Sequence, residues 1–323
     1  MELKTLKPTN IIKAEEVEII PSDDFIKANT TRVQLNHLID DSIIPVFAKD
    51  NESTISHQDF IETAYKVTDF VFSGEKILEP TIKVSHPIKG RIPEAKHKSP
   101  KELLDHEKTL YYERMAFLID IPSITNNISG NKISLTIGGV RAYNHENLYS
   151  KKSEERFKVF IGFKNWVCTN LCISTDGIIT DMRVRSVEEL GKGIIALLRK
   201  FNIEQELVSL ANLKNYSITE NQFAQLIGKS KMYQYLPLKQ KKELFEFPLV
   251  DSQVSTITKD YYRDESFCRN TNGYINLWKL YNLFTSANKS SYIDTFLERG
   301  KNCSEFINII AKNVENKQFW YLN

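Results

Sequence analysis

The chain has 323 residues, of which 41% are hydrophobic and 26% are charged, close to the averages of soluble globular proteins. This composition argues against wholesale disorder and is enough for one large domain or two smaller ones. No apolar run approaches the length of a membrane span, and the first residues lack the layout of a signal peptide. We therefore expect a cytoplasmic protein without a membrane partner, whose four cysteines remain reduced.

The formal net charge of +2 hides an asymmetry along the chain. Residues 1–80 carry 8 Lys+Arg against 15 Asp+Glu, a balance of −7, whereas residues 81–242 carry 26 against 16, a balance of +10. A basic middle region indicates either a surface that binds polyanions or a region that the acidic start neutralises within one fold. The composition leaves both interpretations open.

Residues 1–55 are predicted to form an acidic N-terminal arm of short extended pieces, partly ordered by packing on the body. Residues 56–185 are predicted to form a helix followed by a sheet. The helix begins at the N-cap Ser56, with Asp59 three residues later, and ends near Gly74. Stretches rich in β-branched and aromatic residues then predict strands at 81–88, 109–121, 132–143, 156–163, 166–174 and 177–186.

Residues 186–323 are predicted to be helical and to pack on the sheet as one unit. Ser186 with Glu189, and Thr219 with Gln222, have the spacing of capping boxes. Further helices are expected at 251–263, 274–287, 291–299 and 304–317. The predicted fold class is α+β: a largely antiparallel sheet with a flanking helix, followed by an all-helical C-terminal half.

The stretch "FKNWVCTNLC" places two cysteines four residues apart in the strand predicted over 166–174. In a strand, Cys168 and Cys172 share a face about 13 Å apart, too far to hold one tetrahedral ion together. We expect buried structural thiols, no metal and no other cofactor.

The sequence does not exclude an enzyme, although it favours a protein without catalytic activity. His145 and Asn147 stand in a loop after a predicted strand, where functional residues often occur. With Cys168 they are the weak catalytic candidates. A catalytic cysteine would need a basic neighbour that only the fold can supply.

Basic residues interleaved with aromatic ones give the strongest physical signal, because single-stranded nucleic acid is bound by cationic grooves and stacking rings. The competing interpretation is a solvated lysine-rich surface with tyrosines in the core. A third basic stretch spans 86–101. The candidate nucleic-acid-binding residues are Arg141, Tyr143, Tyr149, Lys151, Lys152, Arg156, Lys158, Lys164 and Trp166, and, in a second cluster, Lys229, Lys231, Lys239, Lys241 and Lys242.

At "LTIGGVRAYNHENLYSKK", "VFIGFKNWVCTN" and "LWKLYNLFTSANKSSYIDTFLER" the chain resembles domain of unknown function family 3871 over nearly its full length. More distantly, it is similar to the phage and plasmid family of unknown function 932. That second likeness rests on two motifs, which correspond here to Trp166, Val167, Cys168 and Asn170, and to Trp278, Asn282 and Thr285. Asn165 and Asn288 depart from it, since arginine and histidine are usual there. The resemblance implies an accessory protein of mobile elements in gut anaerobes and names no reaction.

The leading hypothesis is a protein of a plasmid, phage or conjugative element that binds DNA, single-stranded DNA in particular, in replication, recombination or transfer. The first alternative is a protein-interaction module, such as one that blunts a host defence system. Its acidic arm would dock on a host or element-encoded protein. The second alternative is an uncharacterised enzyme with a site around His145.

Overall fold

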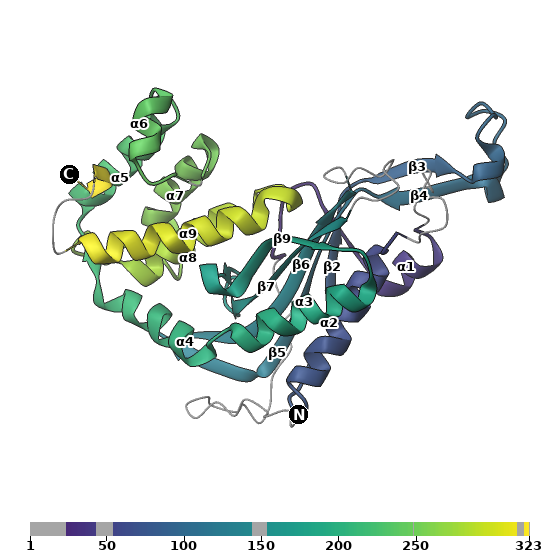
Figure 1. The fold of residues 1–323 in the computed structure, drawn as a ribbon. Coiled ribbons are helices and arrows are strands. Elements are labelled where there is room, and N and C mark those ends of the chain that lie inside the picture. The colour runs from purple at the N-terminus through teal and green to yellow at the C-terminus, as the bar shows by residue number, and fades with distance from the viewer. Residues whose placement is uncertain (1–23, 43–53, 144–153, 248, 315–319, 323) are drawn as a thin grey trace.

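The computed structural model describes residues 24–42, 54–143, 154–247, 249–314 and 320–322. An antiparallel sheet with flanking helices is followed by a helical C-terminal half, which confirms the predicted α+β class (Figure 1). None of the described helices is long and apolar enough to cross a membrane.

The main sheet is antiparallel throughout and curls around its own helices (Figure 1). Its order is β1 (Thr31–Val33), β2 (Thr81–Val84), β5 (Arg114–Ile128), β6 (Asn131–Ala142), β7 (Glu155–Asn165) and β8 (Leu171–Cys172). The strand β9 (Ile178–Val184) also pairs with β7, so β7 has β8 along one part of its edge and β9 along another.

A separate hairpin of β3 (Pro87–Arg91) and β4 (Lys108–Tyr112) projects from the sheet as an arm (Figure 1). The arm corrects the single strand predicted over 109–121. The chain breaks at Glu113: β4 pairs only with β3, whereas β5 pairs with β2 and β6. One apolar stretch therefore serves two sheets.

The helices largely follow the predicted caps. Ser56 and Asp59 form a reciprocal capping box at the start of α2, and Thr219 does the same with Gln222 on α5. At α3 only half of the predicted box is present, because the Glu189 carboxylate accepts from the backbone of Arg185 instead of Ser186. The helices are α1 (Leu35–Asp40), α2 (His57–Val71), α3 (Val187–Lys200), α4 (Ile203–Asn212), α5 (Glu220–Tyr233), α6 (Leu238–Glu243), α7 (Asp251–Arg263), α8 (Leu277–Asn288) and α9 (Ile293–Asn313), with the short strands β10 (Ser217–Ile218) and β11 (Ile275–Asn276) between them.

The helix α9 corrects the two helices predicted at 291–299 and 304–317. It is one helix of 21 residues that passes through Gly300 without interruption. It lies across one face of the sheet, opposite the face covered by α2 and α3 (Figure 1). Its first part packs on this face through Ile293, Phe296 and Leu297, whereas Phe306 and Ile310 farther along belong to the larger apolar cluster.

Each face of the sheet has its own apolar core. On the α2 face, Phe60 packs so closely on Gly139 that a Cβ at that glycine would lie 2.3 Å from the ring. On the α9 face, Leu118 and Phe160 of the strands pack with Phe296. The backbone nitrogens of residues 27 and 28 donate to the carbonyl of residue 289 at the end of α8, which holds the N-terminal segment on this second face.

Candidate nucleic-acid interface

Arg141 on β6 is buried and paired inside the fold. Its guanidinium donates to the carboxylate of Glu155 and to the backbone carbonyl of Ile55. It also lies over the rings of Tyr143 and Phe157, 4.6 and 4.4 Å from their centroids. Tyr143 is buried as well. Arg141 and Tyr143 thus join the sheet to the segment at the start of α2, and neither side chain is exposed to solvent.

The basic residues of β7 are also engaged by other parts of the chain. Lys164 is buried in an ion pair with Asp120, and Lys158 pairs with Glu298 of α9. Arg156 is half-exposed, and its Nε lies 3.8 Å from a carboxylate oxygen of Asp181 on β9. These cations hold neighbouring elements together, so they do not form an open cationic surface.

Trp166 has a similar internal role. Its indole Nε1 donates to Ser134 at 2.8 Å, and the ammonium of Lys164 lies 4.9 Å from the ring centroid. The remaining candidates of the first cluster and of the weak catalytic site lie outside the described residues: His145, Asn147, Tyr149, Lys151 and Lys152.

The strand predicted over 166–174 is wrong: residues 166–168 form a turn, and only Leu171 and Cys172 are extended in β8. Thr169 has a φ of +55°, so the alternation of side chains breaks there. The sulfur of Cys168 and Nδ2 of Asn170 both lie near the Asn282 amide oxygen, at 3.7 and 3.4 Å.

This turn is tied to α8 by a buried polar network that joins the two motifs of the sequence. Asn165 donates to the Asn282 side chain at 3.0 Å, and Asn170 donates to the Asn282 carbonyl at 2.8 Å. Lys289 donates to the carbonyl of Cys168 and, at 2.9 Å, to the Thr169 hydroxyl. The network packs a turn of the sheet against a helix.

The thiols inside the fold are not poised for nucleophilic chemistry. Burial raises the pKa of Cys168 to about 11, so this thiol stays protonated at neutral pH. Cys172 and Cys303 are fully buried, and burial raises the pKa of each thiol further. Among the described residues, no group of three or more His, Cys, Asp or Glu is placed to hold a metal ion.

The second basic cluster lies on α5 and α6, at the end of the molecule remote from the β3–β4 arm (Figure 1). Lys229 donates to the carbonyl of Trp320, and Lys241 donates to the carbonyl of Gln234 at 2.7 Å. Lys239 and Lys242 are exposed on α6. Lys231 points instead into a groove shared with α7.

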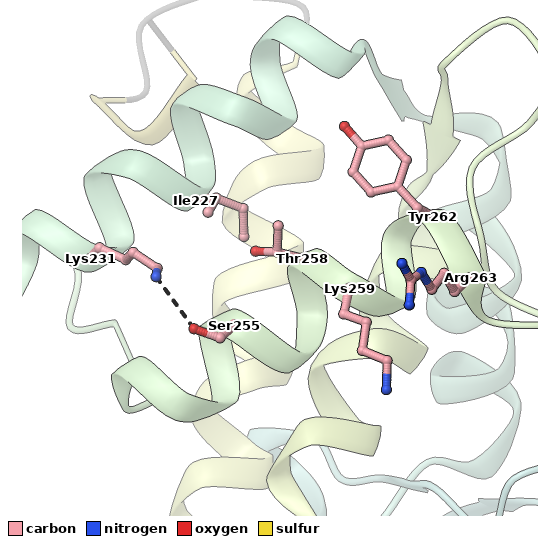
Figure 2. Close-up of a pocket in the computed structure, with 7 residues that line it drawn as sticks. All are labelled: Ile227, Lys231, Ser255, Thr258, Lys259, Tyr262 and Arg263. Atoms are coloured by element: carbon pink, nitrogen blue, oxygen red, sulfur yellow. Dashed lines mark hydrogen bonds between the residues drawn. The ribbon is translucent and has the colours of Figure 1, made fainter.

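This groove, of about 540 Å³, lies between α5 and α7 (Figure 2). Lys231 reaches across it from α5, and its Nζ donates to the hydroxyl of Ser255 on α7 at 3.3 Å. Three of the seven lining side chains are cationic, three carry a hydroxyl group and none carries a carboxylate. The lining is Ile227, Lys231, Ser255, Thr258, Lys259, Tyr262 and Arg263.

Within the described part of the chain, Lys259 and Arg263 make no ion pair and no side-chain hydrogen bond, although Lys259 is close enough to Asp260 to lower the pKa of that carboxyl group. Lys231 has a carboxylate of Asp251 at 3.5 Å. Tyr262 is 50% exposed, its hydroxyl donates to Glu220 at 2.7 Å, and the Arg269 guanidinium lies 5.0 Å from the centroid of its ring. The groove therefore combines positive charge with an aromatic ring that a hydrogen bond holds at its hydroxyl end.

Sequence reasoning identified one wall of this groove and missed the other. Ser255, Lys259 and Arg263 recur every four residues, which places them on one face of the helix predicted over 251–263. That spacing was the available signal. Asp251 and Asp260 in the same stretch make its composition neutral, and the approach of α7 to α5 is a tertiary contact.

The comparisons with known proteins place the chain without assigning a reaction. No curated protein and no solved structure matches it. One family model matches residues 6–322, nearly the whole length. The chain belongs to the family described as "Domain of unknown function, B. Theta Gene description (DUF3871)".

Proposed function

We infer that this protein binds DNA, and single-stranded DNA in particular, through the groove between α5 and α7. The observation that carries the proposal is a groove with three cations, three hydroxyl groups and no carboxylate in its lining. Lysine, arginine and hydroxyl side chains are the usual contacts to phosphate oxygens, and aromatic rings stack on unpaired bases. In this assignment Lys259 and Arg263 contact phosphates, and Tyr262 stacks on a base.

The contacts extend beyond the groove along α6. Lys239 and Lys242 are exposed on this short helix, which follows α5 in the chain. A strand that passes from the groove over α6 would meet five cations, counting the three of the groove. A setting in replication, recombination or transfer of a mobile element rests on the sequence resemblance.

The test is fluorescence-anisotropy titration of a labelled single-stranded oligonucleotide at several salt concentrations. With five phosphate contacts, three in the groove and two on α6, we expect the logarithm of the binding constant to fall with log salt at a slope of about −3.5. In Lys259→Ala/Arg263→Ala, affinity should fall about 10-fold or more and the slope should flatten by about 1.4. Duplex DNA of the same length tests the preference for single strands.

The matched control is Arg199→Ala/Lys214→Ala, which removes the same two residue types from exposed positions outside the groove. It should bind as the wild type does. Equal losses in the two double variants, or wild-type binding without dependence on salt, would contradict the groove as a DNA site.

A protein partner is the second candidate function, and the surface next to the groove favours it. Met232 near the end of α5, Tyr235 in the connection and Leu238 at the start of α6 are 57%, 87% and 78% exposed. Large apolar side chains gathered on a surface mark interaction sites. An absence of salt-sensitive DNA binding in the titration would favour this alternative, such as a module that blunts a host defence system.

A further inference from the structure

A second cleft, of about 660 Å³, shares no lining residue with the α5–α7 groove and has different chemistry. It is formed by the 3-10 turn η4 (Thr175–Gly177), the helix α4 and the C-terminal part of α9. Its wall is rich in amide and hydroxyl groups, and it contains three carboxyl groups, those of Asp176, Glu206 and Glu305. A volume of this size suits a small molecule.

Glu206 on α4 is the innermost acid of the cleft. Burial raises the pKa of its carboxyl group to about 7, with a smaller increase from the nearby carboxylate of Asp176. The hydroxyl of Ser174 opposes this increase. The Ser174 oxygen is itself buried, without a hydrogen-bond partner of good geometry among the described residues. The floor of the cleft therefore holds two polar groups, the Ser174 hydroxyl and the Glu206 carboxyl group, that the surrounding protein satisfies only in part.

The charges around Glu206 leave it without a counter-ion. Glu305 is engaged by the Thr175 hydroxyl at 2.7 Å and by Lys301 at 3.4 Å. Lys200 and Lys312 line the cleft from exposed positions at its rim. Behind Glu206 stand Cys172 and Tyr281, both buried acids whose pKa values are raised. Within the part of the chain that the structure describes, no cation shifts the pKa of Glu206, whose neighbours in the cleft are the Ser174 hydroxyl and the Asp176 carboxylate.

A charged carboxyl group that is buried without a neighbouring cation destabilises a fold. Such groups are common at functional sites, where a bound ligand can supply the missing charge. An ammonium or guanidinium group supplies the missing charge and several hydrogen-bond donors at once. An anionic ligand would meet three carboxyl groups inside the cleft, and a neutral ligand would leave the charge of Glu206 unmet.

We propose that the cleft between η4, α4 and α9 binds a small cationic ligand whose ammonium or guanidinium group sits on Glu206 beside Asp176. The neutral side chains of Gln205, Ser209 and Asn308 line the same cleft and hydrogen-bond the rest of the ligand. This site is independent of the DNA groove, which shares no residue with it.

The test measures the pKa of Glu206 in the full-length protein by carboxyl-carbon NMR. The measurement is made with and without small fragment probes. Butylammonium and butylguanidinium are compared with butanol and butylurea, which keep the same chain and lack the charge. At about 50 mM of either cation, we expect the pKa of Glu206 to fall by about one unit, because a bound cation favours the carboxylate. The neutral probes should leave it unchanged.

Glu206→Gln should weaken binding of the cationic probes about 10-fold or more, measured by shifts of the Asn308 and Gln205 amide signals. Glu204→Gln, which removes an exposed acid from the same helix, is the matched control and should bind normally. Glu206→Gln should also keep wild-type affinity for single-stranded DNA, which separates this proposal from the first. An unchanged pKa at this cation concentration, equal effects of the neutral probes, or full binding by Glu206→Gln would overturn it.

Discussion

Asn282 is the residue at which two distant parts of the sequence meet. Its amide oxygen accepts from Asn165, its carbonyl accepts from Asn170, and its amide nitrogen donates to the carbonyl of Trp278 one turn earlier. All of these groups are inside the protein, where an unmet hydrogen bond costs far more than it does at the surface. These two distant stretches of the sequence thus have a structural role in packing the turn on α8.

We predict that Asn282→Ala lowers the free energy of unfolding by about 2–4 kcal/mol, because it strands the Asn165 amide without an acceptor and opens a small cavity. Urea denaturation followed by tryptophan fluorescence measures the change. Asn215→Ala, at an exposed asparagine, is the control and should stay within about 0.5 kcal/mol of the wild type. A loss below about 1 kcal/mol at Asn282 would show that the network contributes little.

At the scale of elements, α9 shows how a glycine can be mistaken for a helix end. Gly300 is buried in the middle of this helix, in the gap between the two helices predicted there. A Cβ at this position would lie 3.5 Å from the Asn288 amide nitrogen and 3.8 Å from the Ile173 side chain, which is ordinary contact. The glycine is tolerated there without being required by the space around it.

We therefore predict that Gly300→Ala raises the free energy of unfolding by about 0.5–1 kcal/mol, because alanine loses less backbone entropy in a helix. Equilibrium urea unfolding is again the measurement. Gly139→Ala is the contrasting variant, since its new Cβ would lie 2.3 Å from the Phe60 ring, and it should destabilise. Destabilisation by both substitutions would mean that Gly300 is required after all.

What the sequence could and could not predict follows from the range of the interactions. The helix α7 was expected over 251–263 and has those bounds, because its apolar residues follow a local periodicity. The turn at 166–168 was missed because Thr169 adopts a positive φ that sequence rules reserve for glycine or asparagine. The groove and the Glu206 cleft each combine separate segments of the chain, so no local sequence pattern could predict them.

At the scale of the whole molecule, the sheet and the helical half depend on each other. The strands present Leu118, Val140 and Phe160 on the face that α9 covers with Phe296 and Leu297. The other face is covered in part by α3, which also follows the sheet in the sequence. Neither face of the sheet is complete before residue 186.

We predict that a fragment of residues 1–186 does not fold cooperatively, because both faces of its sheet would expose apolar side chains to water. Near-ultraviolet circular dichroism during a urea titration should show no sigmoidal transition for the fragment and a single one for the full chain. A cooperative transition in the fragment would establish residues 56–185 as a domain that folds on its own.

The contacts of Lys289 have a consequence for the order in which the protein is made. Its carbonyl holds residues 27 and 28, and its ammonium holds the turn at residues 168 and 169. During synthesis, both earlier segments must wait until the ribosome has released the end of α8 before they gain this partner. Such long separations between contacting residues slow folding. The sheet therefore lacks these contacts during most of translation. In this period we expect the nascent chain to depend most on a chaperone.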